Sequence, residues 1–197
     1  MYKTGLFTAA LLTALSTDAF SSEIDSSIGV YLGLKGGYSN FSKVDWSQDC
    51  CGKDSWEVSD TTGYGLYAGY KINSNLAVEI EYMNFDSKTT EDQLNAYDPA
   101  TDTWYTAKSD YESDSYSVYG TYRTTGKIFF KGRLGFTYQE QAFSSNLGNY
   151  NLPTVYESGL SGSIGIGTNV QKFTIEADYT YASESLSFYS AGILFNF

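Results

Sequence analysis

The chain has 197 residues, and its 23 acidic and 12 basic side chains give a net charge of −11 at pH 7. A charge of this sign disfavours nucleic acid and anionic membrane surfaces as partners, because like charges repel. There is no histidine, which excludes mechanisms that use imidazole as a base or ligand, including Ser-His-Asp hydrolysis and the usual zinc sites. We predict no enzymatic activity, no dedicated metal site and no cofactor.

Residues 1–21 have the pattern of a secretory signal peptide. Lys3 supplies the positive start, residues 6–15 are apolar apart from two threonines, and Ala19-Phe20-Ser21 offers small residues for cleavage. Cleavage after Ala19 is the alternative to cleavage after Ser21. No later stretch approaches the ~20 apolar residues of a membrane-spanning helix. The exported domain, residues 22–197, is therefore expected to enter a membrane only as strands.

Eight later segments alternate polar and apolar residues with the period of two that is typical of β-strands. We expect these strands at about residues 30–38, 62–72, 76–83, 116–123, 128–139, 160–170, 173–181 and 190–197. Three connections are short, among them Asn73-Ser74-Asn75, whose residues tolerate positive φ. Four are longer, at about residues 42–60, 86–112, 141–156 and 182–186. The sequence therefore predicts an all-β fold, an eight-stranded antiparallel up-and-down β-barrel with four long outer loops and three short turns.

Periodicity alone does not say which face of this barrel points inward, since a soluble barrel has the same alternation. The lumen of an eight-stranded barrel holds side chains and little else, so the many large aromatic residues of the apolar face would overfill it. With the polar face inside, those aromatic residues form girdles at the two membrane interfaces. We therefore predict a transmembrane barrel with a polar lumen.

The predicted lumen face carries both signs of charge. Because buried charges must be neutralised locally, we expect a structural ion-pair cluster; a narrow ion path through the same residues and a carboxylate pair acting as acid and base are the alternatives. Glycines recur on this face, which we interpret as room for the long side chains and for the tight curvature of the wall. The charged residues are Lys35, Lys71, Glu79, Glu81, Arg123, Lys131, Arg133, Glu176 and Asp178, and the glycines are Gly33, Gly37, Gly65, Gly69, Gly165 and Gly167.

The predicted outer loops concentrate negative charge and tryptophan. Residues 86–114 hold eight acidic residues and two lysines, and all three tryptophans lie in the predicted loops. Such a surface suits a basic or carbohydrate partner; the alternatives are divalent cations held near lipopolysaccharide, and a solvated loop whose charge keeps it soluble. Residues 98–102 lack the ligand spacing of a calcium loop. The candidate recognition residues are Trp46, Trp56, Tyr97, Trp104 and Tyr105.

The only two cysteines, Cys50 and Cys51, are adjacent. In an exported chain they would normally be oxidised, yet neighbouring Cα atoms lie ~3.8 Å apart, below the usual range for a disulfide. A vicinal disulfide would therefore be strained. Free thiols and a link to another chain are the alternatives, and the sequence does not choose among the three states.

The chain ends in a strand that keeps its alternation up to the terminal carboxylate, from Ser190 to Phe197. Most soluble domains leave their last residues polar and frayed. This stretch resembles the C-terminal assembly signal of bacterial outer-membrane β-barrels, whose polar, glycine and aromatic positions are matched by Ser190, Gly192, Phe195 and Phe197.

Residues 28–197 as a whole resemble the small outer-membrane barrel family that includes the opacity proteins, OmpX and the transmembrane domain of OmpA. The resemblance rests on the eight-strand pattern, the glycine-rich run at 159–167, the strand at 174–181 and Phe197. It implies a non-enzymatic, monomeric protein of the Gram-negative outer membrane. Its partners would be membrane lipid, lipopolysaccharide and the barrel assembly machinery, with adhesion, host or envelope interaction carried by the loops. A narrow porin is the second hypothesis, and an enzyme is a distant third.

Overall fold

The computed structural model describes residues 29–41, 44–48, 52–56, 61–86, 90–98, 103–145, 154–184 and 186–197. The predicted signal peptide, residues 1–21, lies outside this part of the chain and stays a prediction. No helix in the described chain is long and apolar enough to cross a membrane. The strands are β1 (Gly29–Phe41), β2 (Val44–Gln48), β3 (Gly52–Trp56), β4 (Thr61–Lys71), β5 (Leu76–Asp86), β6 (Thr90–Asp98), β7 (Thr103–Arg123), β8 (Ile128–Ser145), β9 (Val155–Val170), β10 (Phe173–Tyr181) and β11 (Leu186–Asn196).

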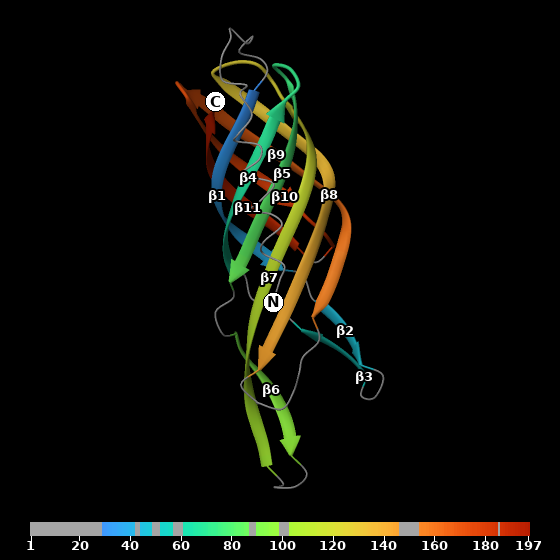
Figure 1. Ribbon diagram of the computed structural model, residues 1–197. Helices are drawn as coiled ribbons and strands as arrows, with labels where there is room; N and C mark the ends of the chain where they lie inside the picture. The colour runs from blue at the N-terminus through green and yellow to red at the C-terminus, as the bar shows by residue number, and fades with distance from the viewer. Residues whose placement is uncertain are drawn as a thin grey trace.

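Eight of these strands close into an antiparallel barrel (Figure 1). The order around the wall is β5-β4-β1-β11-β10-β9-β8-β7, and β7 pairs with β5 to complete the ring. The first and last strands of the ring along the chain, β1 and β11, are neighbours, with Leu34 opposite Ile193. This closure leaves no free edge in the wall, which is the condition for β-strands to cross a bilayer. The predicted fold class is confirmed.

Two of the predicted long connections contain strands that the sequence analysis missed. Within residues 42–60, β2 pairs with β3; within residues 86–112, β6 pairs with the first part of β7, and this hairpin projects beyond the barrel (Figure 1). These long outer connections therefore contain regular β-hairpins in addition to the eight strands of the wall. Apolar periodicity did not reveal β6 and the start of β7, because polar residues occupy both sets of alternating positions there.

The two faces of the wall have opposite chemistry. Leu134 and Ile164, which point outward, are 70% and 71% exposed, whereas the inward-pointing Lys131 and Glu79 are 3% and 0% exposed. A soluble barrel would show the reverse arrangement, because exposed apolar area costs free energy in water. The exposed apolar band is therefore the lipid-facing surface of a transmembrane barrel.

The short turns lie together at the end of the barrel that carries the C-terminus. In the β4–β5 turn, the side-chain oxygen of Asn73 accepts hydrogen bonds from the backbone N–H groups of Asn75 and Leu76 at 2.8 and 2.9 Å. The positive φ expected there is absent; among the described residues other than glycine it occurs only at Gln171, where φ is 57°. The side chain of Asn73 thus stabilises the β4–β5 turn, whereas the β9–β10 turn uses the left-handed backbone conformation of Gln171.

Candidate functional site

The lumen contains a continuous chain of charges of alternating sign. It starts at Lys35 on β1 and passes back and forth across the barrel between β5, β8, β7 and β10. The order is Lys35, Glu81, Arg133, Glu79, Arg123, Glu176, Lys131 and Asp178, with successive nitrogen–oxygen distances of 2.5, 2.5, 3.5, 2.8, 3.3, 2.5 and 3.2 Å. We call this set the charge chain.

Every member of the charge chain is largely withdrawn from solvent. The most exposed of the eight side chains is Arg123, at 12%. Bringing two ions out of water is costly, and their mutual attraction compensates for it only where the geometry is good and the remaining donors and acceptors are satisfied. Four cations meet four carboxylates here, so the chain as a whole is neutral and each charge lies beside an opposite one.

Tyrosines donate hydrogen bonds to two of the carboxylates and stack on the cations. Tyr31 donates its hydroxyl hydrogen bond to Glu79 at 2.5 Å, and Tyr67 donates to Glu176 at 2.7 Å. The guanidinium of Arg123 lies 4.7 Å from the ring centre of Tyr31, and that of Arg133 lies 4.4 Å from the ring of Tyr119. Desolvated cation–π contacts of this kind contribute on the order of 2 kcal/mol.

Arg133 makes the largest number of different contacts in the charge chain. Besides Glu81 and Glu79, it donates from Nε to Ser163 at 2.5 Å and from a terminal nitrogen to Thr180 at 3.0 Å. Its planar, forked guanidinium can satisfy partners on several strands at once, which a lysine cannot do. Arg133 therefore connects β8 to β5, β9 and β10 across the lumen.

Lys71 is the predicted lumen cation that the structure does not bring into the charge chain. Its Nζ donates to the side-chain oxygen of Asn196 at 2.6 Å and lies 5.8 Å from the ring centre of Tyr31. Among the described residues no carboxylate lies within ion-pair distance of it. Lys71 is the last residue of β4, at the short-turn end, and this position puts it beyond the reach of the central carboxylates.

The inward glycines provide room for large rings of neighbouring strands. A Cβ atom at Gly33 would collide with the ring of Tyr67, and one at Gly69 would collide with that of Tyr31. In both cases the glycine and the tyrosine are direct cross-strand partners. Sequence reasoning related these glycines to the long charged side chains and missed the role of the tyrosines. The alternation of glycine and tyrosine on one face was the available signal.

Two apolar clusters pack against the charge chain in the lumen, and the sequence analysis missed these as well. One consists of Met83, Phe85, Ala182, Leu186 and Phe188, near the long-loop end, with the rings of Phe85 and Phe188 5.3 Å apart. The other consists of Tyr31, Tyr67, Ala77 and Leu194, near the short-turn end. Because Tyr31 and Tyr67 donate hydrogen bonds to Glu79 and Glu176, the second cluster packs among the charges.

The arrangement offers little to catalysis. Each of the four carboxylates lies within 3.5 Å of a cation, so Glu79 and Glu81, or Glu176 and Asp178, are bound as ion-pair partners. Within the described part of the chain no group of acidic, cysteine or histidine side chains has a geometry that would hold a metal. What the charge chain does physically is link opposite walls of the barrel.

On the lipid-facing side, tyrosines form a belt below the outer rim. The rings of Tyr82, Tyr116, Tyr138 and Tyr156 follow one another over β5, β7, β8 and β9, with centroids 5.1, 6.4 and 6.1 Å apart. Tyr82 donates to the carboxylate of Asp114 at 2.7 Å. Amphipathic rings such as that of tyrosine are favoured at the membrane–water interface. This belt therefore marks the outer boundary of the apolar band.

The candidate recognition residues lie on the projecting strands and not in irregular loops. The backbone register pairs Tyr97 with Trp104 in the β6–β7 hairpin, and Trp46 and Trp56 belong to β2 and β3. Tyr105 follows on β7 opposite Ala96. Their side-chain surroundings, and Cys50 and Cys51 altogether, lie outside the described residues.

The predicted assembly signal forms the half of β11 nearer the short-turn end, together with the terminal residue. Ser190 is buried toward the lumen and Gly192 lies on the same face. Phe195 and Phe197 point to the lipid side, with ring centroids 4.8 Å apart, and the N–H of Phe197 donates to the carbonyl of Val30 at 3.1 Å. The terminus is therefore tied to β1 at the closing seam; its recognition by an assembly machinery stays a prediction.

Comparison with known proteins agrees with this geometry. No curated protein matches the chain. Among solved structures, Ail, the attachment invasion locus protein of Yersinia pestis, in complex with the heparin analogue sucrose octasulfate, is 16% identical over 86% of this chain and 99% of that chain, with a TM-score of 0.52. Neisserial surface protein A is 17% identical over 86% of this chain and 97% of that one, with a TM-score of 0.56.

Identities this low show a shared fold and not a shared activity. The family model for the outer membrane protein beta-barrel domain, in contrast, matches residues 7–193, almost the whole chain. The chain belongs to this family, the outer membrane β-barrel proteins of Gram-negative bacteria.

Proposed function

We propose that this protein is a non-enzymatic surface adhesin whose long-loop end binds a positively charged partner, on a host cell or within the envelope. The observation that carries the proposal is the charge chain. Seven ion pairs between 2.5 and 3.5 Å, packed together with two apolar clusters, leave the lumen a structural role. The alternative function, a narrow porin, needs an open aqueous path through those same residues.

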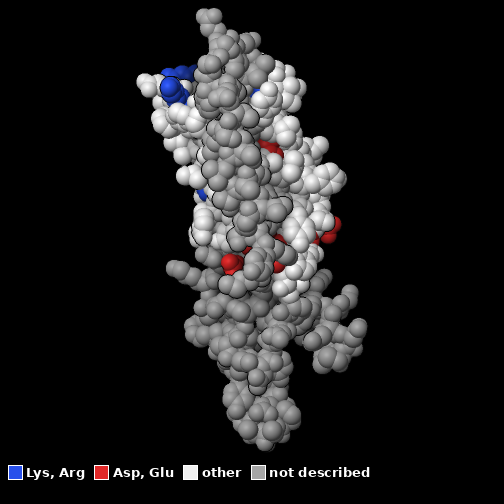
Figure 2. Space-filling model, in the orientation of Figure 1, with Lys and Arg blue, Asp and Glu red and all other residues white. Residues whose placement is uncertain are grey.

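The distribution of charge over the sequence supports a cationic partner. The four segments at the long-loop end, residues 42–60, 86–114, 140–157 and 182–186, hold sixteen acidic and four basic residues. The short turns at the opposite end carry Lys127 and Lys172 and no acidic residue. Figure 2 shows lysine and arginine atoms gathered at the short-turn end and carboxylates further toward the other. A surface of one sign steers an oppositely charged partner toward it.

Similarity to Ail favours attachment but not the same ligand. Ail was crystallised with a heparin analogue, which is a polyanion. A polyanion would be repelled by an outer end with the charge described above, so we expect this protein to select a ligand of the opposite sign. Tryptophan and tyrosine in the projecting hairpins are residues typical of binding hot spots.

The test uses the full protein in lipid nanodiscs, with polylysine as the probe and polyglutamate as its control. We expect binding of polylysine that weakens as salt is added and no binding of polyglutamate. Replacing residues 95–106 by Asn-Gly shortens the β6–β7 hairpin by whole cross-strand pairs, since Asn95 lies opposite Thr106 and Leu94 opposite Ala107. This variant should fold and bind polylysine much less.

Two finer variants separate charge from aromatic contact. Asp98→Asn with Asp102→Asn should lower the salt dependence of binding, because it removes charge and keeps shape. Trp104→Ser with Tyr105→Ser should lower affinity and leave the salt dependence unchanged. Equal binding of the two polymers, or binding unaffected by shortening the hairpin, would contradict the proposal.

A further inference from the structure

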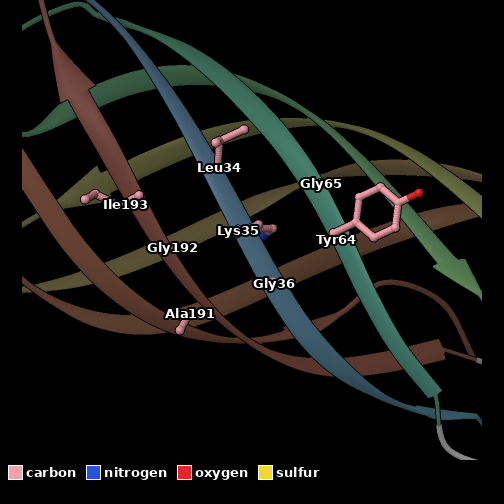
Figure 3. A pocket seen from close by; sticks show the side chains of 8 residues that line it. All are labelled: Leu34, Lys35, Gly36, Tyr64, Gly65, Ala191, Gly192 and Ile193. Carbon is pink, nitrogen blue, oxygen red and sulfur yellow. The ribbon is translucent and has the colours of Figure 1, made fainter.

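The short-turn mouth of the lumen holds a cation that no carboxylate of the described residues balances. The charge chain is neutral by itself, so Lys71 adds one positive charge to the lumen. Lys35 shows the contrast: in Figure 3 its side chain is seen end-on at β1, where it enters the lumen, and there it pairs with Glu81 at 2.5 Å. A half-buried cation without a counter-ion is costly, so this mouth favours an anion.

A second cation lies beside Lys71 and increases the local positive charge. The amine of Lys71 lies 5.8 Å from the ring centre of Tyr31, and the guanidinium carbon of Arg123 lies 4.7 Å from it. One terminal nitrogen of Arg123 serves Glu79 and Glu176. Its Nε is buried and has no hydrogen-bond partner in the described part of the chain. Arg123 therefore has a donor left for a ligand.

A buried hydroxyl without a partner faces the same space. Thr121 is 2% exposed, and its Oγ1 makes no hydrogen bond within the residues that the structure describes. Ala77 is the cross-strand partner of both Lys71 and Thr121, so only a methyl group lies between their side chains. Neighbouring strands are about 4.8 Å apart, which places the backbones of Lys71 and Thr121 about 10 Å apart. A small anion fits between the two side chains.

A band of hydrogen bonds fixes Lys71 from the opposite side. Its amine donates to the side-chain oxygen of Asn196 at 2.6 Å, the amide of Asn196 donates to Thr174 at 3.3 Å, and the hydroxyl of Thr174 donates to Asn169 at 2.8 Å. The band therefore extends from β4 over β11 and β10 to β9. An ammonium group has three donors, so two remain at the mouth for a ligand.

The mouth is open to periplasmic water and has a cationic surround. Short turns of such barrels face the periplasm, and the flanking turns carry the exposed Lys127 and Lys172 and no acidic residue. Figure 2 shows lysine and arginine atoms gathered at this end. A field of this sign steers anions toward the mouth. The wall of the barrel separates the inward-pointing Lys71 from the bilayer, so the anion is a soluble one.

We infer that this mouth binds the phosphate group of a small soluble molecule in the periplasm. Lysine and arginine are the usual ligands of phosphate. The oxygens of a tetrahedral phosphate can accept from Lys71 on one side and from Arg123 Nε and Thr121 on the other, whereas a planar carboxylate has only two oxygens to offer. The site lies at the opposite end of the barrel from the proposed adhesive surface and does not depend on it.

Three substitutions provide a matched test. Lys71→Met removes the central cation and keeps its length, and no ion pair among the described residues is lost. Thr121→Val removes only the hydroxyl and is the second site variant in case Lys71→Met does not fold. Lys127→Met is the control, because it removes a cation from an exposed turn at the same end. Heat-modifiable gel migration checks that each variant folds.

The measurement is an NMR titration of the isotope-labelled protein in phosphatidylcholine nanodiscs, with inorganic phosphate as the probe and chloride at equal ionic strength as its control. We expect saturable shifts of the amide signals of Lys71, Thr121 and Arg123 in the wild type and in Lys127→Met. Binding should be lost in Lys71→Met and weakened about tenfold in Thr121→Val, which loses a hydrogen bond to a charged group.

Three results would overturn the inference. The first is a response to phosphate no larger than the response to chloride, or equal in the wild type and Lys71→Met. The second is equal affinity for acetate, which would exclude selection of phosphate. The third is the same set of shifts on adding phosphatidylglycerol to the nanodiscs in the absence of phosphate, which would assign the site to a lipid headgroup. None of these results depends on binding at the long-loop end.

Discussion

Replacing Arg133 by alanine removes the residue with the most partners in the lumen. Glu81 then keeps only Lys35, and Glu79 keeps Arg123 and Tyr31, while Ser163 and Thr180 lose a donor. Removing one partner of a buried ion pair typically costs 3–5 kcal/mol, because the other charge stays buried. We therefore expect the free energy of unfolding to fall by about 3–5 kcal/mol.

Urea unfolding in lipid vesicles, followed by heat-modifiable gel migration, measures this change. Lys127→Ala is the control, since it removes a cation from an exposed turn and should alter stability by less than about 0.5 kcal/mol. Adding Glu79→Gln to Arg133→Met should recover part of the loss, because both charges then leave together while Glu81 keeps Lys35 and Arg123 keeps Glu176. A cost below about 1 kcal/mol for Arg133→Ala, the value of a solvated pair, would refute the reasoning and indicate a water-filled lumen.

Three further changes test the membrane assignment, the C-terminus and the cysteines. Leu134→Lys places a charge on a side chain that is 70% exposed on the lipid face, and should destabilise the barrel in vesicles by about 2–4 kcal/mol if the site lies near the bilayer midplane; a harmless lysine together with solubility in the absence of detergent would contradict the assignment. Deleting Phe197 should block assembly in cells, measured as surface level, while detergent refolding is much less affected; normal surface levels would show that the terminal aromatic is not recognised. Replacing Cys50 and Cys51 by serine should leave a folded barrel, because closure of the wall does not depend on the loops; loss of heat-modifiable migration would show that the pair is structural.

Alternation of side chains made the barrel wall predictable. On β5, Glu79 and Glu81 alternate with Ile80, which separates a polar face from an apolar one. The small volume of an eight-stranded lumen then assigned the polar face to the inside. The ends of β10 could be placed for the same reason. The β6–β7 hairpin could not, because a strand with polar residues on both faces carries no alternation of hydrophobicity.

Which charged side chains form ion pairs in the lumen could not be predicted without the register between strands. The sequence places Lys71 and Lys131 on the same face, yet only Lys131 contacts carboxylates, Glu176 and Asp178. The two lysines differ in their position along the barrel axis, and this position is set by the register between neighbouring strands. The same holds for Tyr67, whose place over Gly33 is set by their being cross-strand partners.

The central claim is that the charge chain closes the lumen and leaves recognition to the outer end. Planar-bilayer conductance of the purified, refolded protein tests it most directly, with Glu79→Gln and the variant lacking residues 95–106 measured alongside. We predict no stable channel in the wild type or in the shortened hairpin, because the neutral chain of ion pairs spans the lumen and packs with two apolar clusters. A steady open channel whose ion selectivity changes with Glu79→Gln and is unaffected by shortening the hairpin would contradict the account.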